Sequence, residues 1–308
     1  MKPNTLAKRM LDYIHREQLW RPGDAILISV SGGLDSMVLL HLLAKNQAAH
    51  KAQLRVISFD HGVRPESKEE VAFVAQKASE YKIDTDIISL DLCKEQSHFQ
   101  ERAREARRAE WAKYREHRVA TAHHGNDQAE TVLFRLLRGS GLTGLRGMLP
   151  RQDKMVRPLL FAFRKDIENY AEYHGIEWRE DPSNAVSWRG KLRSMESVLA
   201  ELRANPMQSL AQTARLLARE EDYLSGLAQQ HFERVKRQNA LDYGLLRSLH
   251  PALQLRVLRV WLGEWNVVPH AKQAEAFLHW TARNGSRIYI AKQAELSMEQ
   301  GLLCVKLK

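Results

Sequence analysis

The chain has 308 residues, 44% of them hydrophobic and 27% charged, which allows two domains with buried cores and argues against wholesale disorder. Its net charge of +10 favours a polyanionic partner such as nucleic acid and simple solubility about equally. The sequence shows no apolar run of the ~20 residues that a membrane span needs, no secretory signal and no closely spaced cysteine pair. We therefore expect a cytoplasmic protein without membrane contact.

Helix-like and strand-like segments alternate along the N-terminal half. An amphipathic helix is predicted over residues 1–20, and strands over 25–31, 54–60, 84–91 and 118–123. Helices are predicted between them, over 34–47, 66–82, 99–117 and near 127–138. This alternation is typical of an α/β fold with a parallel sheet covered by helices, in which ligands bind beyond the carboxyl ends of the strands. That edge brings together Ser31, Asp60–His61 and His123–Asp127.

The pattern changes after about residue 200. Two long helix-like stretches follow, at 207–238 and 249–265, and the chain finishes with short strand-like segments over 286–308. We therefore predict two domains, residues 1–205 and residues 206–308. The second should be smaller and mainly helical, with a short β tail.

The stretch SGGLDS stands between the first predicted strand and the helix that follows it. Its residues are Ser31, Gly32, Gly33, Leu34, Asp35 and Ser36. Glycines let the backbone approach an anion closely, and a helix N terminus exposes N–H groups and the positive end of its dipole. Asp35 among such groups makes sense if a divalent cation binds as well. The loop therefore predicts a polyphosphate with Mg²⁺; the alternative is a tight turn in which Ser31 or Asp35 caps the helix.

SGGLDS resembles the pyrophosphate loop of the ATP pyrophosphatase superfamily, and three further stretches select one family within it. They are FDHGVRPES (59–67), ERAREARR (101–108) and TAHHGNDQAETVLFRLLRGSGLTGLRGM (121–148). With them the chain resembles the tRNA-isoleucine lysidine synthetases over nearly its whole length. The resemblance implies a sheet of the adenine-nucleotide α-hydrolase type in an ATP-binding catalytic domain, followed by a tRNA- and substrate-binding domain.

The resemblance also implies a reaction between ATP, free L-lysine and the isoleucine tRNA with a CAU anticodon. ATP would activate the C2 oxygen of the wobble cytidine, at tRNA position 34, and the ε-amine of lysine would then displace AMP. ATP and Mg²⁺ would bind at Ser31–Ser36, with Asp60 and His61 also near the nucleotide. For His61 a satisfied loop histidine is the alternative. The sequence leaves open whether the chain acts as a monomer or a homodimer.

Asp127 and Glu130 are three residues apart and therefore share one helix face. The pair could hold the cation of the lysine substrate, and Asp127 could bind Mg²⁺. The alternative is a capping box, Asp-x-x-Glu, at the start of a helix. His123, His124 and Asp127 could instead be zinc ligands, but no fourth ligand is evident. We expect His123 and Asp127 to be catalytic.

Basic residues complete the predicted site. Arg104 and Arg107 are three apart on one helix and could stabilise charge on the α-phosphate; the alternative is a solvated face paired with interleaved glutamates. Residues expected to contact tRNA are Arg138, Arg189, Lys191 and Arg193. Gly190 departs from the family, which commonly has an asparagine there.

Three rival functions remain open from the sequence. One is a tRNA 2-thiolation enzyme on the same scaffold, although such enzymes typically use cysteines that Cys93 and Cys304 do not match in spacing. Another is an amide-forming synthetase. The third is a non-catalytic RNA-binding protein with a relic nucleotide loop, which ATP–pyrophosphate exchange would distinguish from an enzyme.

Overall fold

The structure is a computed structural model that describes residues 4–60, 62, 66–90, 99–179 and 188–307. It divides into two compact units, residues 1–218 and 219–308. The division falls within one long helix, α10 (Pro206–Val235). The domain boundary that the sequence places at 205/206 coincides with the start of this helix and stays a prediction.

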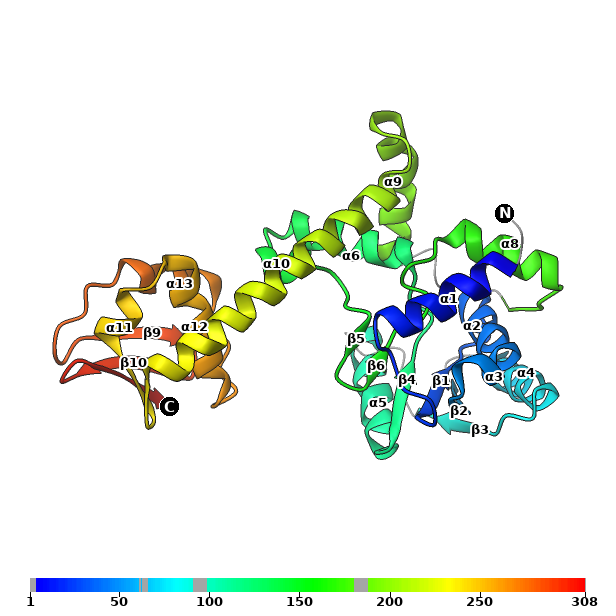
Figure 1. The fold of residues 1–308 in the computed structure, drawn as a ribbon, viewed down its shortest axis with the longest axis horizontal. Coiled ribbons are helices and arrows are strands. Elements are labelled where there is room, and N and C mark those ends of the chain that lie inside the picture. The colour runs from blue at the N-terminus through cyan, green and yellow to red at the C-terminus, as the bar shows by residue number, and fades with distance from the viewer. Residues whose placement is uncertain (1–3, 61, 63–65, 91–98, 180–187, 308) are drawn as a thin grey trace. The chain divides into compact units, whose positions relative to one another are not determined.

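The first unit is built on a six-stranded sheet in the order β3-β2-β1-β4-β6-β5 (Figure 1). Its strands are β1 (Ala25–Ser29), β2 (Gln53–Asp60), β3 (Thr85–Ser89), β4 (His117–Ala120), β5 (Arg151–Gln152) and β6 (Met155–Val156). All neighbours pair in parallel except β5, which is antiparallel to β6. The α/β fold with a parallel sheet that the sequence predicted is confirmed.

The order of the strands indicates where along its edge this sheet would bind a ligand. From β1 the chain adds β2 and then β3 on one side, and it returns to the other side of β1 with β4. The segments that follow β1 and β4 therefore diverge at a topological switch point, where open α/β sheets bind ligands. Ser31 and His123 follow those two strands.

Helices cover both faces of the sheet. The helices of this unit are α1 (Asn4–Arg16), α2 (Leu34–Lys45), α3 (Gln47–His50), α4 (Glu66–Glu80), α5 (Phe99–Lys113), α6 (Gly125–Leu137), α7 (Leu142–Leu145), α8 (Arg164–His174) and α9 (Trp188–Leu202). Ile26 and Ile28 of β1 join the main core, whereas Leu27 between them packs on the other face, next to Trp111 of α5. A strand covered on both faces requires the continuous apolar run that β1 shows.

Helix α2, which follows the predicted SGGLDS loop, is deeply buried. Nine of its twelve residues are buried, and its sequence is apolar nearly all round for that reason. One polar residue in its interior, His41, is only 8% exposed and makes a 3.0 Å hydrogen bond between its Nδ1 and the hydroxyl of Tyr170 on α8. Helices α2 and α8 are thus fixed against each other.

The second unit has a five-stranded antiparallel sheet in the order β7-β8-β11-β10-β9. These strands are β7 (Lys236–Arg237), β8 (Ala240–Asp242), β9 (Arg287–Ala291), β10 (Ala294–Glu299) and β11 (Leu302–Leu307). Its helices are α11 (Tyr243–Arg247), α12 (Pro251–Gly263) and α13 (Ala271–His279). Trp261 and Phe277 are fully buried in its core. The predicted β tail is part of a larger sheet, because β7 and β8 pair with it.

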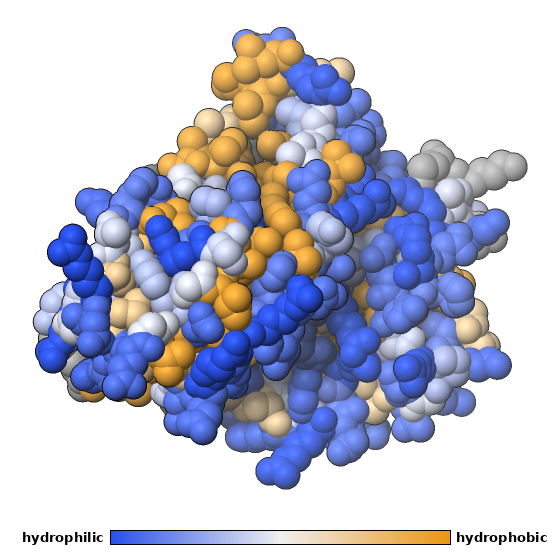
Figure 2. All heavy atoms as spheres, turned by 60° about the vertical axis from the view of Figure 1, so that its left-hand side comes forward, coloured by the Kyte–Doolittle hydropathy of each residue, from blue (hydrophilic) through white to orange (hydrophobic). Residues whose placement is uncertain are grey.

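Two surface properties accompany this fold. No helix among the described residues is long and apolar enough to cross a membrane. Apolar side chains are nevertheless exposed near the end of α9, where Val198 is 56% and Leu202 82% exposed, and Figure 2 shows apolar atoms gathered at the top of its view. Exposed apolar clusters commonly mark interaction surfaces.

Candidate active site

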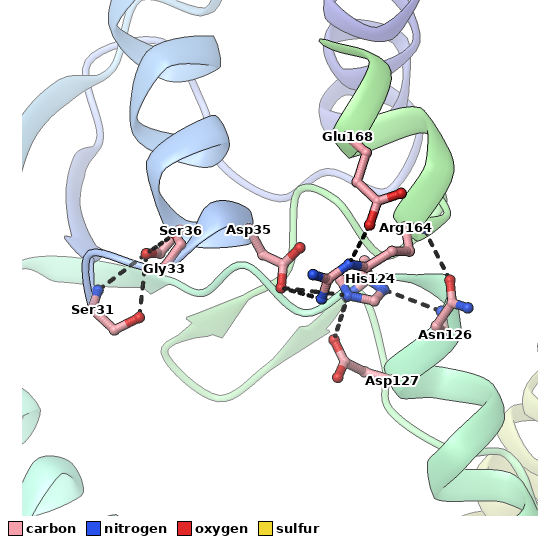
Figure 3. A network of polar contacts seen from close by, with 9 residues as sticks. All are labelled: Ser31, Gly33, Asp35, Ser36, His124, Asn126, Asp127, Arg164 and Glu168. Atoms are coloured by element: carbon pink, nitrogen blue, oxygen red, sulfur yellow. Dashed lines mark hydrogen bonds and ion pairs between the residues drawn. The ribbon is translucent and has the colours of Figure 1, made fainter. Parts of the chain in front are cut away.

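The loop from Ser31 to Ser36 is held in a defined shape by its own serines (Figure 3). The backbone N–H of Ser31 donates to Ser36 Oγ at 3.2 Å, and Ser36 Oγ donates to the carbonyl of Gly33 at 2.9 Å. Gly32 has φ +83°, a conformation that side chains rarely adopt, so glycine is required there. Its carbonyl also accepts from the backbone N–H of Arg179 at 2.9 Å.

The N terminus of α2 lies at the end of the Ser31–Ser36 loop. Gly33 is its extended N-cap residue, and no side chain within the described residues caps it. The first N–H groups of a helix lack intrahelical partners, and the helix dipole adds positive potential at the same end. Such an end binds anionic groups such as phosphate. The alternative from the sequence, in which Ser31 or Asp35 caps this helix, is not seen.

The carboxylate of Asp35, in the first turn of α2, faces the segment after β4 (Figure 3). Asp35 Oδ2 lies 3.7 Å from His124 Nε2, and its other oxygen, Oδ1, is buried without a hydrogen-bond partner among the described residues. A carboxylate oxygen left in this state suits a hard cation. The described residues contain no cluster of three or more metal-ligating side chains.

His124 connects the two sides of the site. It is the N-cap of α6, and its Nδ1 accepts from the backbone N–H of Asn126 at 3.2 Å, so the neutral ring carries its proton on Nε2. That Nε2 faces two carboxylate oxygens, Asp35 Oδ2 and, at 3.6 Å, Asp127 Oδ2. Burial opposes a charge on the ring, but Asp127 and Asp35 outweigh burial and raise the pKa of His124 above its ordinary value.

Asp127 has a structural role that the sequence only partly anticipated. Its Oδ2 accepts from the backbone N–H of His124 at 2.9 Å, which closes a capping box between His124 and Asp127. The box therefore joins residues 124 and 127, not 127 and 130 as the alternative had it. Glu130 lies one turn further along α6 and is only 2% exposed. The assignment of Asp127 and Glu130 to the lysine substrate stays a prediction.

Three residues of this network were missed from the sequence: Asn126, Arg164 and Glu168. Arg164 begins α8, and its NH1 lies 3.8 Å from Asp35 Oδ2 while its Nε donates to Glu168 Oε1 at 2.9 Å. Asn126 Oδ1 accepts from the backbone N–H of Arg164 at 3.0 Å. The pattern RKDIENYAEYHG, an amphipathic stretch with glycine at its end, could have predicted α8.

Other predicted residues lie in more ordinary surroundings. Asp60 is 6% exposed, and its Oδ1 accepts from the backbone N–H of Gly62 at 2.8 Å, which is a local turn. His61 lies outside the described residues. His123 Nδ1 is 2.8 Å from the hydroxyl of Thr121, which orients the ring. The nucleotide role of Asp60 and the catalytic role of His123 remain predictions.

Of the two predicted arginines of α5, Arg104 lies near a third, buried arginine, Arg157. Arg107 Nε donates to the carbonyl of Ala103, and Arg104 is exposed. Arg157 follows β6 and is only 4% exposed. Burial, and next the positive charge of Arg104, lower the pKa of Arg157 to about 10. Arg104 thus adds a positive charge near the buried Arg157, and its phosphate role stays a prediction.

The glycine-rich segment after α6 is firmly anchored. Gln128 accepts from the backbone N–H of Met148 at 2.6 Å and donates to its carbonyl at 3.0 Å, and Arg135 donates to the carbonyls of Gly144 and Gly147. Arg138, predicted to contact tRNA, lies over the ring of Phe134 at 4.7 Å. The other predicted tRNA residues, Arg189, Lys191 and Arg193, lie in α9, and their side chains are outside the described set.

Comparison with known proteins identifies the class to which this site belongs. Residues 3–194 match the model of the PP-loop domain family, which covers more than half of the chain. The chain therefore belongs to this family, whose members use ATP. Residues 241–299 match a second model, the TilS substrate binding domain.

Curated relatives share one printed name, tRNA(Ile)-lysidine synthase. The protein from Symbiobacterium thermophilum is 38% identical over 71% of this chain and 48% of its own length. The proteins from Alkalilimnicola ehrlichii and Pseudomonas putida are 33% and 31% identical over 85% of this chain and 60% and 64% of their own lengths. The chain thus spans about half to two thirds of the length of these relatives.

A solved structure supports the fold. The U34-tRNA thiolase NcsA from Methanococcus maripaludis superposes with a TM-score of 0.59 at 18% identity, over 70% of this chain and 80% of that one. At that identity the likeness concerns the fold alone.

Proposed function

We propose that this chain joins free L-lysine to C2 of the wobble cytidine, position 34, of the isoleucine tRNA with a CAU anticodon, and is thus an ATP-dependent ligase. One observation carries the proposal: the N terminus of α2, which no side chain among the described residues caps, faces the Asp35–His124–Asp127 group in a chain that also matches the TilS substrate binding domain. An anion site next to carboxylates fits a reaction that combines a nucleotide with a cationic amino acid.

The reaction has two steps that balance. The C2 oxygen of the cytidine attacks the α-phosphorus of ATP, and the bond to pyrophosphate breaks. The ε-amine of lysine then attacks C2, the C2–O bond breaks, AMP leaves and the amine gives up its proton. The N–H groups at the start of α2, with Ser31 and Ser36, would hold the departing pyrophosphate.

Mg²⁺ would be held by Asp35, with Asp127 as a second carboxylate, and would supply positive charge to the phosphates when bound. Arg104 and Arg107 would neutralise the α-phosphate from α5, and Asp60 and His61 would lie beside the nucleotide. His123 would be the remaining catalytic residue.

Charged side chains would bind the two other substrates, lysine and tRNA. Asp127 and Glu130 would bind the ammonium groups of lysine as charge-assisted acceptors. Arg138, Arg189, Lys191 and Arg193 would bind the tRNA backbone, which suits the net charge of +10. We place this activity in the cytoplasm, and the proposal accommodates a monomer or a homodimer.

The deciding experiment is incubation of the purified protein with tRNA, ATP and radiolabelled lysine, followed by nucleoside analysis. The proposal expects one labelled nucleoside, derived from cytidine, with one pyrophosphate and one AMP released for each lysine incorporated. Pyrophosphate release without lysine incorporation would point to another tRNA modification such as 2-thiolation. Binding of tRNA with no pyrophosphate release would point to a non-catalytic RNA-binding protein.

A further inference from the structure

Among the described residues, Arg164 is the one cation in the network around Asp35 that comes from outside the Ser31–Ser36 loop and the segment after β4. It begins α8, and its backbone N–H is fixed to Asn126 Oδ1 at 3.0 Å, so its main chain is anchored to the first turn of α6. Gly125 makes this approach possible, because a Cβ there would lie 2.7 Å from Phe163 Cε1 and 2.8 Å from the carbonyl oxygen of Ala162. The position of the Arg164 guanidinium is therefore set by a main chain that is hydrogen-bonded to α6.

The contact between Arg164 and Asp35 is an ion pair without a hydrogen bond. NH1 is 3.8 Å from Asp35 Oδ2, whereas Nε makes a 2.9 Å hydrogen bond to Glu168 Oε1 (Figure 3). The Arg164 side chain is 41% exposed, so it can turn without repacking the core. A guanidinium carries five N–H donors in a fixed fork that matches phosphate oxygens. Its bond to Glu168 uses only one of them.

We propose that Arg164 is a phosphate-binding residue that serves as the counter-cation of Asp35 until a nucleotide arrives. This rests on the proposed use of ATP. A divalent cation on Asp35 repels the guanidinium, and the phosphates beside it attract the guanidinium, so both charges drive the same small movement. Glu168, one turn along α8, holds Nε while the other nitrogens change partner.

The proposal predicts two effects of opposite sign for one substitution. In Arg164→Gln, ATP measured in EDTA should bind about tenfold more weakly, because a charge-assisted contact to phosphate is lost. Mn²⁺ measured without nucleotide should bind about threefold more tightly, because Asp35 has lost a competing cation across a partly exposed pair. A purely structural role of Arg164 would weaken both.

The matched control is Lys165→Gln, which removes the same charge from the next, exposed residue of α8. ATP binding is measured by equilibrium dialysis, and Mn²⁺ binding by the loss of its free electron paramagnetic resonance signal. Circular dichroism confirms that each variant is folded. Arg164→Lys should retain part of the ATP affinity, since it keeps the charge but not the fork.

The outcomes separate this inference from the proposed function. Wild-type protein that does not bind ATP would overturn both. If ATP binds and Arg164→Gln behaves as Lys165→Gln does, or if both affinities fall together, the proposed function stands and the role of Arg164 is refuted. Weaker ATP and tighter Mn²⁺ in Arg164→Gln alone would establish it.

Discussion

The N termini of two helices lie at the candidate site, and they differ in whether side chains cap them. Helix α2 begins at Gly33 with no side-chain cap among the described residues, whereas α6 begins with a capping box made by His124 and Asp127. Both starts follow neighbouring parallel strands, β1 and β4. Under the proposed function, the uncapped end of α2 takes a phosphate on its first N–H groups, for which the described residues supply no side-chain cap, and the capping box of α6 places the carboxylate of Asp127 nearby.

The largest expected effect tests the uncapped end of α2. Asp35→Asn should reduce ATP-dependent pyrophosphate release by about 10²- to 10³-fold, because the cation loses its carboxylate and transition-state charge is no longer stabilised. The measurement is pyrophosphate release in the presence of tRNA and lysine. The variant should still bind tRNA in a gel-shift assay. Asp84→Asn is the control, since the side chain of Asp84 is 86% exposed; equal activity of the two variants would remove Asp35 from the site.

The second prediction concerns His41, the buried histidine of α2 that bonds to Tyr170 of α8. Burial, and next His174 and Lys45, lower the pKa of His41 to about 4, and Tyr81 and the Tyr170 hydroxyl complete its surroundings. A histidine with a lowered folded-state pKa stabilises the fold above its unfolded pKa near 6.5, and that contribution disappears as pH falls towards 4.

The loss amounts to at most about 3 kcal/mol of unfolding free energy. Urea unfolding of wild type and His41→Gln, from pH 7.5 to about 4, measures it. The stability gap between the two proteins should narrow as the pH falls. A gap that stays constant would mean that the pKa of His41 is the same in the folded and unfolded states.

Third, the capped end of α6 depends on a close approach of main chains. Gly125→Ala should destabilise the protein by about 2 kcal/mol, because its Cβ would overlap Phe163 and Ala162. Gly226→Ala in α10 is the opposite control: nothing lies within 4 Å of a Cβ there, and alanine favours a helix by up to about 1 kcal/mol. Thermal unfolding should thus move in opposite directions for the two variants. A shift of the same sign would show that α6 can move away.

The smallest expected effect tests whether Asp127 binds the lysine substrate in addition to capping α6. Asp127→Asn should raise the lysine concentration needed for half-maximal ligation about tenfold, since a charged acceptor is lost. Asp166→Asn is its match, because Asp166 Oδ2 likewise accepts from the backbone N–H three residues earlier, at the start of α8. Both substitutions should cost about 1 kcal/mol of stability. A normal lysine requirement in Asp127→Asn would leave that residue with the capping role only.

Local pattern was enough to predict much of the first unit. The apolar run at residues 25–31 and the periodic helices around it predicted the parallel sheet, and the glycines of SGGLDS predicted a tight turn after its first strand; that this turn binds an anion stays a prediction. The same reasoning extended the fourth strand to residue 123, but the strand ends at Ala120. The backbone N–H of Gly125 instead bonds to the carbonyl of Ala162 at 2.6 Å. That contact joins segments remote in the sequence, and no local periodicity carries it.

The sequence by itself determined that a glycine turn with Asp35 would follow a buried strand, because backbone freedom and burial are properties of neighbouring residues. Only the tertiary structure decided which groups surround that carboxylate. His124 and Arg164 reach it because strand order puts β4 beside β1 and because α8 is anchored on the start of α6. Pairings of this kind depend on the folding of distant segments onto one another.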